Sequence, residues 1–305
     1  MVNVDAHYDL RYVDTLQASQ PDLCPDSTGS GEYHVILLNY LWPSWWRNAI
    51  ADAKTVILAD GAASRLAAVA AGETLNECGR HEGSSAELRV AADTVCRLLS
   101  SALGAAKFIS VGDYDSMTPR TVEFLETYGI ARNHVPEQDS TDGSKALTLL
   151  LNLLSVNKSS GPSSAPATPV TPIIPRVLML GAFGGRLDHC LCHFCLLHKY
   201  GSQCTIHLHG DNNVALLIPP TQASSQREPS PVTLSLPRSL KIDAVGVIAH
   251  NGPCRVWSEG LKWDMNGLLL GYETIQSGCN VPLSKSVRVS SDGFVIFTLS
   301  YSLTG

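Results

Sequence analysis

The strongest constraint on the fold is an alternation of short apolar runs with helical patterns, which extends from residue 35 to residue 218. Each apolar run has the length and β-branched content of a buried strand, and the stretches between them have the periodicity of helices. Strands that alternate with helices form βαβ units, in which the helix connects two parallel strands. We therefore expect an open, mostly parallel, Rossmann-like α/β sheet. Its main predicted strands begin at Val35, Thr55, Lys107, Arg176, Cys204 and Val214.

Capping residues predict the ends of two of the intervening helices. Thr118 followed by Pro119 forms an N-cap and first-turn pair, because the Thr hydroxyl can accept a backbone N–H and proline has none to lose. Gly129 and Gly201 stand where helices commonly end. One helix is thus expected to begin at Pro119 and another to end near Gly201.

The pattern changes after about residue 233, where helical periodicity gives way to short alternating segments. Such segments are typical of antiparallel strands, so we expect a small all-β sandwich. Stretches rich in Ser, Pro and Thr cannot support a packed core and are expected to be loops. The predicted organisation is an N-terminal extension (1–34), a catalytic α/β domain (35–218) with insertions near 72–86 and 155–175, a flexible linker (219–232) and the β-sandwich domain (233–305).

Composition narrows the class of partner. A formal net charge of −6 argues against nucleic acid, whose binding depends on Lys and Arg that neutralise phosphates. No apolar run reaches the roughly 18 residues of a membrane span, and the N-terminus lacks the features of a signal peptide. Nine scattered cysteines suggest reduced thiols rather than a disulfide framework. We expect a cytoplasmic protein that binds small molecules.

Acidic and glycine-rich clusters follow four of the predicted strands or extended stretches. In an open α/β sheet this places them at the carboxyl edge, where ligands bind. Any one of them could be an ordinary turn, since Asp and Gly are common turn residues. Their convergence on one edge indicates a functional site. The clusters are Asp60 with Gly61, the GDYDS sequence at 112–116, Gln138 to Asp142, and the glycine-rich stretch 181–188 with Arg186 and Asp188.

Carboxylates gathered at one edge repel one another unless a cation neutralises them, and an all-oxygen ligand set favours Mg²⁺ over Zn²⁺. Magnesium at such an edge commonly bridges phosphates. Lys145, on the first turn after Asp142, and Arg186, at a strand-to-helix turn, could bind the same phosphates.

Several common phosphate and acyl-transfer motifs are absent from the sequence. There is no Walker A sequence, no G-x-G-x-x-G after the first strand and no G-x-S-x-G elbow. The residues therefore favour phosphoryl or diphosphoryl transfer by carboxylates, one Lys and one Arg.

In their order along the chain, these motifs resemble those of the thiamin pyrophosphokinase family. Single motifs are weak evidence, but six in sequence over roughly residues 35 to 300 are strong. They are Asp60–Gly61, GDYDS (112–116), Asp139 with Thr141, Asp142 and Lys145, GGRLDH (184–189), GLKW (260–263), and Ser277 with Asn280.

The resemblance implies a Mg²⁺-dependent transfer of diphosphate from ATP to the hydroxyl of thiamin, giving thiamin diphosphate and AMP. It assigns Mg²⁺ to Asp113, Asp115 and Asp142, with Asp60 and Asp139 in a second tier. Lys145 and Arg186 would hold the triphosphate, and Asp115 and Asp139 are both candidates to accept the hydroxyl proton. Further ATP-binding positions are Asp60, Gly61, Gln138, Thr141 and Asp188.

The thiamin site implied by the resemblance lies in the second domain. Trp263 would offer an aromatic face to the cationic thiazolium, and Ser277 and Asn280 would supply hydrogen bonds. The alternative is a core Trp beside a polar turn. The family also implies a homodimer through the β domain, for which the apolar alternation at 268–275 and 294–299 is suitable.

Four residues depart from the family's usual motifs: Ala62, Ser64, Tyr114 and Cys279. Ala62 replaces a glycine, and its side chain occupies space through which a phosphate could approach the backbone. Two rival functions are diphosphate transfer to another small alcohol, such as a hydroxymethylpterin, and non-catalytic binding of thiamin or nucleotide.

Overall fold

The computed structural model describes residues 7–17, 32–73, 85–100, 107–115, 117–159, 174–221 and 230–302. Most of the predicted insertions and linker lies outside these residues, namely 74–84, 160–173 and 222–229. The chain divides into two compact units: residues 32–211, and a unit that joins residues 1–31 to 212–305. No helix among the described residues is long and apolar enough to span a membrane.

The unit formed by residues 32–211 contains a parallel sheet with the strand order β7-β6-β2-β3-β4-β5. The sheet is parallel because each strand is followed by a helix or a crossover connection, as the alternation predicted. Its strands are β2 (Tyr33–Leu37), β3 (Val56–Ala59), β4 (Phe108–Gly112), β5 (Ala131–His134), β6 (Arg176–Leu180) and β7 (Thr205–Gly210).

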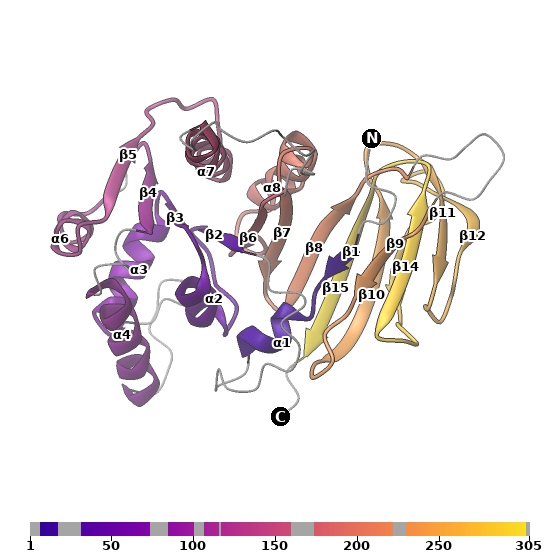
Figure 1. Ribbon diagram of the computed structural model, residues 1–305, viewed down its shortest axis with the longest axis horizontal. Coiled ribbons are helices and arrows are strands. Elements are labelled where there is room, and N and C mark those ends of the chain that lie inside the picture. Colours follow the sequence, from indigo (N-terminus) through magenta and orange to yellow (C-terminus); the bar gives the residue numbers. More distant parts are fainter. Residues whose placement is uncertain are drawn as a thin grey trace, which may run out of the picture. The chain divides into compact units, whose positions relative to one another are not determined.

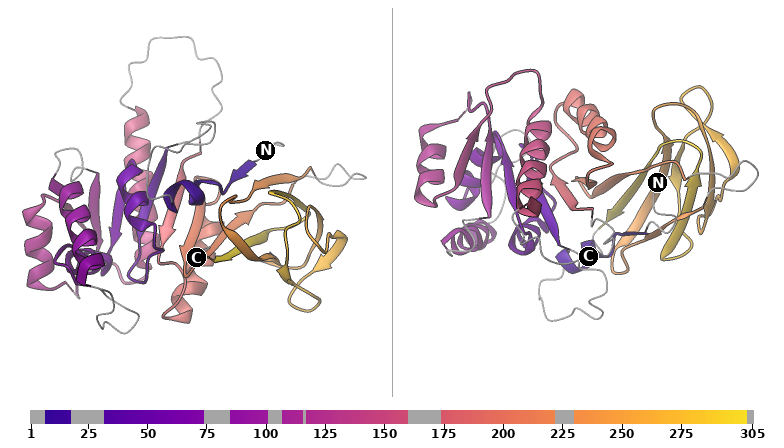
Figure 2. Two further views of the ribbon diagram at one scale, coloured as in Figure 1. Left: turned by 90° about the horizontal axis from the view of Figure 1, so that it is seen from below. Right: turned by 45° about the horizontal axis from the view of Figure 1, so that its top comes forward.

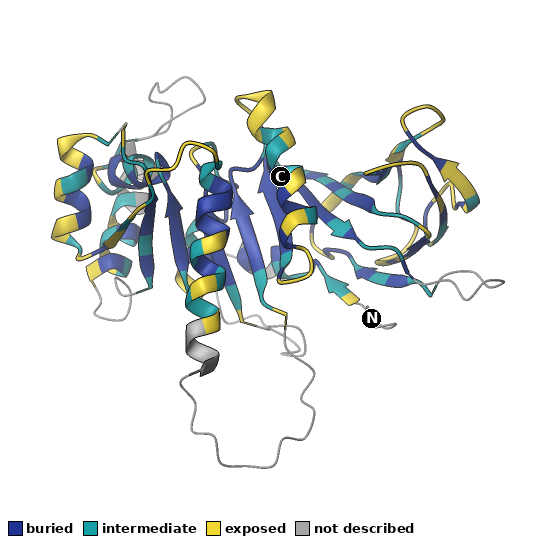
Figure 3. Ribbon diagram, turned by 90° about the horizontal axis from the view of Figure 1, so that it is seen from above, coloured by how far each residue is buried: buried dark blue, intermediate teal, exposed yellow. Residues whose placement is uncertain are grey.

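Helices cover both faces of this sheet: α7 and α8 lie on one side, and α2, α3 and α4 lie on the other (Figures 1 and 2). The inner strands of the sheet are consequently buried on both faces, and the outer sides of the helices are exposed (Figure 3). The edge strand β5 differs, because three of its four residues are exposed. Apolar residues at helical spacing, such as Ala146, Leu147 and Leu150 of α7, are fully buried. The helices are α2 (Trp46–Asp52), α3 (Ala62–Ala70), α4 (Ser85–Ser100), α6 (Pro119–Thr127), α7 (Asp142–Ser159) and α8 (Leu187–Tyr200).

The predicted helix ends are confirmed. Thr118 is the N-cap of α6, where its Oγ1 accepts a hydrogen bond of 3.2 Å from the backbone N–H of Thr121. Gly129, just beyond the same helix, has a φ of +65°, which glycine adopts without steric cost. Gly201 follows α8 with a φ of −61°, so this helix end does not use the freedom of glycine.

The other unit is rich in β-strands and contains two groups of paired strands. One has the order β13-β10-β15-β8 with antiparallel pairings, and the other has the order β1-β9-β14-β11-β12. Their strands are β1 (His7–Asp9), β8 (Asn213–Ile218), β9 (Val232–Ser235), β10 (Lys241–Ala249), β11 (Cys254–Glu259), β12 (Asn266–Leu270), β13 (Ser277–Asn280), β14 (Ser286–Ser291) and β15 (Val295–Ser302). Since these pairings are largely antiparallel, the strands of the described residues are a mixture of parallel and antiparallel. The expected mostly parallel sheet is therefore found only within residues 32–211.

Two segments join this β-rich unit although the sequence places them elsewhere. Strand β8 pairs with β15 and so belongs here rather than with the α/β domain. In the N-terminal segment, β1 pairs in parallel with β9. The apolar residues in and just before α1 (Tyr12–Gln17) are buried, namely Leu10, Val13 and Leu16. Neither segment carries a sequence signal for its partner strand, because the pairing connects residues more than 60 positions apart.

Candidate active site

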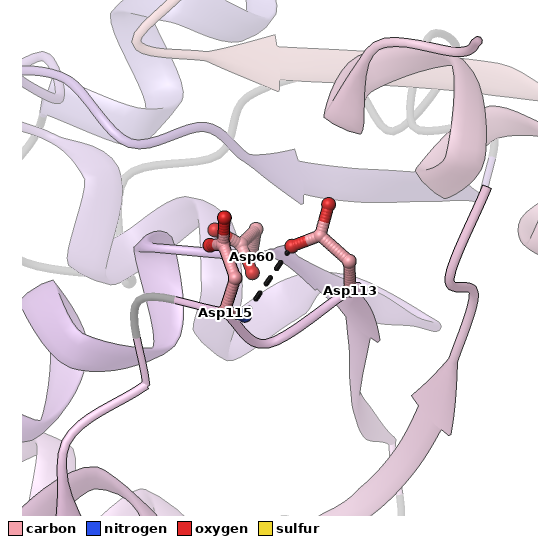
Figure 4. A group of neighbouring side chains, drawn as sticks. All are labelled: Asp60, Asp113 and Asp115. Atoms are coloured by element: carbon pink, nitrogen blue, oxygen red, sulfur yellow. Dashed lines mark hydrogen bonds between the residues drawn. The ribbon is translucent and has the colours of Figure 1, made fainter. Parts of the chain in front are cut away.

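Three carboxylates meet at the carboxyl ends of two neighbouring parallel strands (Figure 4). Asp60 follows β3, and Asp113 and Asp115 follow β4. Because β3 and β4 pair with Ala59 opposite Val111, their last residues come out side by side. One ligand oxygen from each carboxylate lies within 4.8 Å of the others. This arrangement can hold a divalent cation.

Strained backbone helps to bring these carboxylates together. Asp60 has a φ of +40° and Tyr114, between the other two aspartates, has a φ of +61°. Left-handed conformations are rare for residues with a side chain and are retained where the surroundings compensate for their cost. For Tyr114 the hydroxyl compensates, since it donates to the carbonyl of Ser110 at 2.8 Å and to that of Asn133 at 3.3 Å. This departure from the family's motif therefore anchors the carboxylate loop to β4 and β5.

Gly112 makes room for Asp60. A Cβ added at Gly112 would lie 2.5 Å from Asp60 Oδ1, 2.9 Å from its Cβ and 3.0 Å from its Cα. These separations are shorter than van der Waals contacts, so a larger residue would displace the Asp60 carboxylate. The glycine of the GDYDS sequence is thus a steric requirement of the cluster.

Lys145 and Gln138 both bind Asp113. The Lys145 ammonium, 5% exposed on the first turn of α7, donates to Asp113 Oδ2 at 3.2 Å, and the Gln138 amide donates to the same oxygen at 3.0 Å. Partial burial raises the pKa of Asp113, but hydrogen bonds from Lys145, from the Asp115 backbone and from Gln138 outweigh this effect and lower the pKa overall. Asp113 is therefore held as a carboxylate.

Asp142 lies close to the cluster but outside the group of three. Burial, followed by repulsion from Asp60 and Asp113, raises the pKa of Asp142, and Lys145 partly offsets the rise. The structure thus groups Asp60 with Asp113 and Asp115, whereas the predicted ligand set was Asp113, Asp115 and Asp142, with Asp60 in a second tier. Asp60 lies beside Asp113 and Asp115 because β3 and β4 are neighbours in the sheet. The order of strands in a sheet cannot be seen in the sequence pattern.

Arg186 and Asp188 pair with each other at the start of α8. Arg186 donates through Nε and Nη2 to the two carboxylate oxygens of Asp188, at 3.1 and 2.5 Å. The hydrogen bond and charge of Arg186 lower the pKa of Asp188. Both side chains are exposed, at 69% and 61%. A guanidinium presented in this way at a helix start can bind a phosphate.

The other predicted ATP-binding residues serve the local backbone or stand exposed. Gly61 precedes α3, and a Cβ there would overlap the Asn39 side-chain amide. Thr141 Oγ1 accepts the N–H of Ser144 at 3.3 Å and so caps α7. Gln138 and Asp139 are exposed on the turn before that helix.

The remaining departures from the family motif are a buried alanine, a serine that bonds a neighbouring helix, and a cysteine outside this unit. Ala62 is completely buried at the start of α3, so its methyl group packs inside the protein. The hydroxyls of Ser64 and Thr121 share a hydrogen bond of 2.9 Å, which ties α3 to α6. Cys279 is exposed on β13 in the β-rich unit.

The predicted thiamin-binding residues form a local group within the β-rich unit. Trp263 is 57% exposed, which excludes the alternative of a core Trp, and the Lys262 ammonium lies 4.6 Å from its ring centroid. Asn280 is 2% exposed; it accepts the N–H of Trp263 at 3.1 Å and donates to the Trp263 carbonyl at 2.9 Å. Asn280 therefore holds the turn that presents Trp263, and its amide also contacts Ser277 Oγ at 3.5 Å.

A family model described as "Thiamin pyrophosphokinase, catalytic domain" matches residues 46–208, which is more than half of the chain. Thiamine pyrophosphokinase 1 of Oryza sativa subsp. japonica is 26% identical over 193 residues, which cover 62% of this chain and 64% of that protein. Thiamine pyrophosphokinase 1 of Arabidopsis thaliana is 25% identical over 198 residues, covering 64% of this chain and 65% of that protein. The alignments thus span less than two thirds of these relatives.

Solved structures extend the likeness to nearly the whole chain. Thiamin pyrophosphokinase from Candida albicans superimposes with a TM-score of 0.67 and 14% identity, covering 99% of this chain and 95% of that one. The yeast enzyme gives a TM-score of 0.65 and 17% identity, covering 99% and 93%. At these identities the likeness shows a shared fold.

Proposed function

Because this chain belongs to the thiamin pyrophosphokinase family, we propose that it transfers diphosphate from ATP to thiamin, giving thiamin diphosphate and AMP. The observation that carries the proposal is the group formed by Asp60, Asp113 and Asp115, whose oxygens lie within 4.8 Å of one another. Three carboxylates at this separation repel one another, so a cation would stabilise the arrangement. Burial is the main cause that raises the pKa of Asp142, and repulsion from Asp60 and Asp113 raises it further. This repulsion supports the same conclusion.

The donor set fits Mg²⁺, which takes oxygen ligands and shares them with substrate phosphates. Asp60, Asp113 and Asp115 would hold it, with Asp142 beside them. When bound, the ion would neutralise negative charge on the phosphates. Asp60 thus becomes a proposed direct ligand, although the sequence had placed it in a second tier.

The phosphates themselves need cationic partners from the protein. Lys145 would lie beside the β- and γ-phosphates, since its ammonium is held at the carboxylate group by Asp113. Arg186 would bind a terminal phosphate through its guanidinium, with Asp188 fixing its orientation. Backbone N–H groups at the starts of α7 and α8 would add further donors.

In the reaction, the thiamin hydroxyl oxygen forms a bond to the β-phosphorus of ATP. The bond from that phosphorus to the oxygen shared with the α-phosphorus breaks, and AMP leaves with this oxygen. The hydroxyl proton passes to a carboxylate, for which Asp115 and Asp139 are the candidates. Catalysis of this kind depends on positioning and charge neutralisation, which carboxylates, Lys145 and Arg186 can supply.

Trp263 would bind the thiazolium of thiamin through its exposed ring. The ring already attracts one cation, Lys262, at 4.6 Å, which indicates a face suited to cation–π contact. Ser277 would offer a hydrogen bond to the aminopyrimidine. We assign Asn280 a supporting role, because its amide is engaged with the backbone of Trp263.

The test is to incubate the protein with Mg²⁺-ATP and a panel of alcohols that includes thiamin and a hydroxymethylpterin. Of the alcohols in the panel, we expect only thiamin to react, giving AMP and thiamin diphosphate. Asp113→Asn should abolish turnover while the protein stays folded, and Asp52→Asn, which changes an exposed aspartate on α2, is the matched control. Formation of ADP, or equal rates with another alcohol, would refute the assignment. So would near-normal turnover by Asp113→Asn.

Three further properties remain predictions: a Rossmann-like nucleotide site, a cytoplasmic location and a homodimer. For the dimer, the exposed residues Leu268, Leu269 and Ile275 at the β12 edge offer an apolar surface. The second predicted segment, 294–299, is different, because Val295, Phe297 and Leu299 are at most 1% exposed within the chain's own core. The proposed dimer surface is therefore limited to the first segment.

A further inference from the structure

The turn after β2 packs directly on the glycine-rich turn after β6. These strands are parallel neighbours, and the ladder continues beyond them, with the Leu38 N–H donating to the Leu180 carbonyl at 2.9 Å. Trp42 Nε1 donates back to the Leu38 carbonyl at 2.8 Å, which closes the first turn. A Cβ at Gly181 would lie 3.2 Å from both that carbonyl and the Trp42 ring. The two turns are thus in close contact at their start.

Tyr40 extends this contact over the next two glycines. A Cβ at Gly184 would overlap Cε1 and Cζ of the Tyr40 ring, and one at Gly185 would lie 2.8 Å from Cε2 and 2.9 Å from Cδ2. The ring therefore lies across both residues. Gly184 and Gly185 have φ values of +96° and +65°, a conformation that glycine adopts but does not favour over others.

We propose that Tyr40 is a positioning residue, whose ring holds the Gly184–Gly185 turn in the conformation that presents Arg186, oriented by Asp188, to the phosphates of ATP. Arg186 immediately follows the two glycines and is the N-cap of α8. The inference rests on the proposed function for its reaction, but its structural part concerns this turn alone.

The physical reason is the freedom of consecutive glycines. Two adjacent glycines have many accessible backbone conformations, and ordering them at the moment of ligand binding costs affinity. An aromatic ring packed across them restricts the turn before ATP arrives. Because the side chains of Arg186 and Asp188 are 69% and 61% exposed, most of their surface makes no packing contact, and their position depends on the backbone that precedes them.

The first test compares substrate dependence in three variants. Tyr40→Ala should raise the KM for Mg²⁺-ATP about tenfold, as expected for a misplaced phosphate ligand, and leave the KM for thiamin unchanged. Tyr40→Phe keeps the ring and should restore the KM for ATP. Tyr128→Ala, which removes another half-buried tyrosine from the same unit, should change neither constant. A Tyr40→Ala enzyme with the wild-type KM for ATP would overturn the proposal.

The second test does not depend on catalysis. Trypsin cleaves after exposed arginines in mobile backbone, so cleavage after Arg186, followed by mass spectrometry, reports on the order of the turn. We expect Tyr40→Ala to be cleaved there about tenfold faster than the wild type, and Tyr40→Phe and Tyr128→Ala to match the wild type. Unchanged cleavage in Tyr40→Ala would refute the role of the ring. If the wild type lacked activity while cleavage rose as expected, the proposed function would fail and the positioning of the turn would stand.

Discussion

Gly112→Ala should separate the steric requirement of the carboxylate group from the stability of the fold. The φ of Gly112 is not positive, so alanine fits its backbone conformation. The new methyl group, however, would lie 2.5 Å from Asp60 Oδ1 and 3.0 Å from Asp60 Cα. An ordinary carbon contact is about 3.5 to 4.0 Å, so Asp60 has to move by roughly 0.5 to 1 Å. Since one of the overlapping atoms belongs to the backbone, a change of rotamer cannot remove the overlap.

This displacement sets the expected size of the effect. Overpacking a filled site costs about 1–3 kcal/mol of stability, which a domain of this size tolerates. Misplacement of a catalytic group by about 1 Å costs up to about 100-fold in rate. We therefore expect Gly112→Ala to lower kcat by about 10- to 100-fold and to raise the Mg²⁺ concentration needed for half-maximal rate.

The assay measures AMP formation against Mg²⁺ concentration, with unfolding in urea measured in parallel. A double-mutant cycle supplies the decisive comparison, because Asp60→Gly removes most of the atoms that the methyl group would meet. Gly112→Ala should cost clearly less stability in the Asp60→Gly background than in the wild type. An equal loss of stability in both backgrounds would show that the glycine at 112 is not needed to make room for Asp60. A fully active Gly112→Ala enzyme would refute the steric argument.

Trp263→Ala should raise the KM for thiamin about tenfold, which corresponds to the loss of a contact of about 1–2 kcal/mol, and should leave the KM for ATP unchanged. Burial lowers the pKa of His209 to about 3, so the unfolded state takes up a proton first as the pH falls below about 6.5. The contribution of His209 to the free energy of unfolding should then fall by about 2 kcal/mol between pH 7 and pH 5. In urea unfolding, His209→Phe should therefore lose about 2 kcal/mol less stability than the wild type between pH 7 and pH 5. A variant of the exposed His7 should lose as much as the wild type. Sedimentation at micromolar concentration should give twice the chain mass of 32.7 kDa, and Leu269→Glu should give a monomer; a wild-type monomer would refute the β12 surface.

Local patterns in the sequence predicted most of the strands and helices and the family. The alternation after residue 35 predicted the parallel strands, because strand and helix periodicities are local properties of the chain. Thr118, Pro119 and Gly129 predicted a helix with both of its ends for the same reason. The order of short motifs led to the family, since each motif keeps its own spacing whatever lies between them.

Which of these residues meet depends on the pairing of strands that are distant in the sequence. Asp60 joins Asp113 and Asp115 because β3 lies beside β4, and strand order depends on contacts between distant residues. Asn280 binds the backbone of Trp263, a contact across 17 positions that composition does not reveal. Strand β8 and residues 7–17 join the β-rich unit because their partner strands lie far along the chain, and Tyr40 reaches Gly184 because β2 and β6 are neighbours. Local sequence fixes what a segment can become, whereas the pairing of segments is a property of the whole chain.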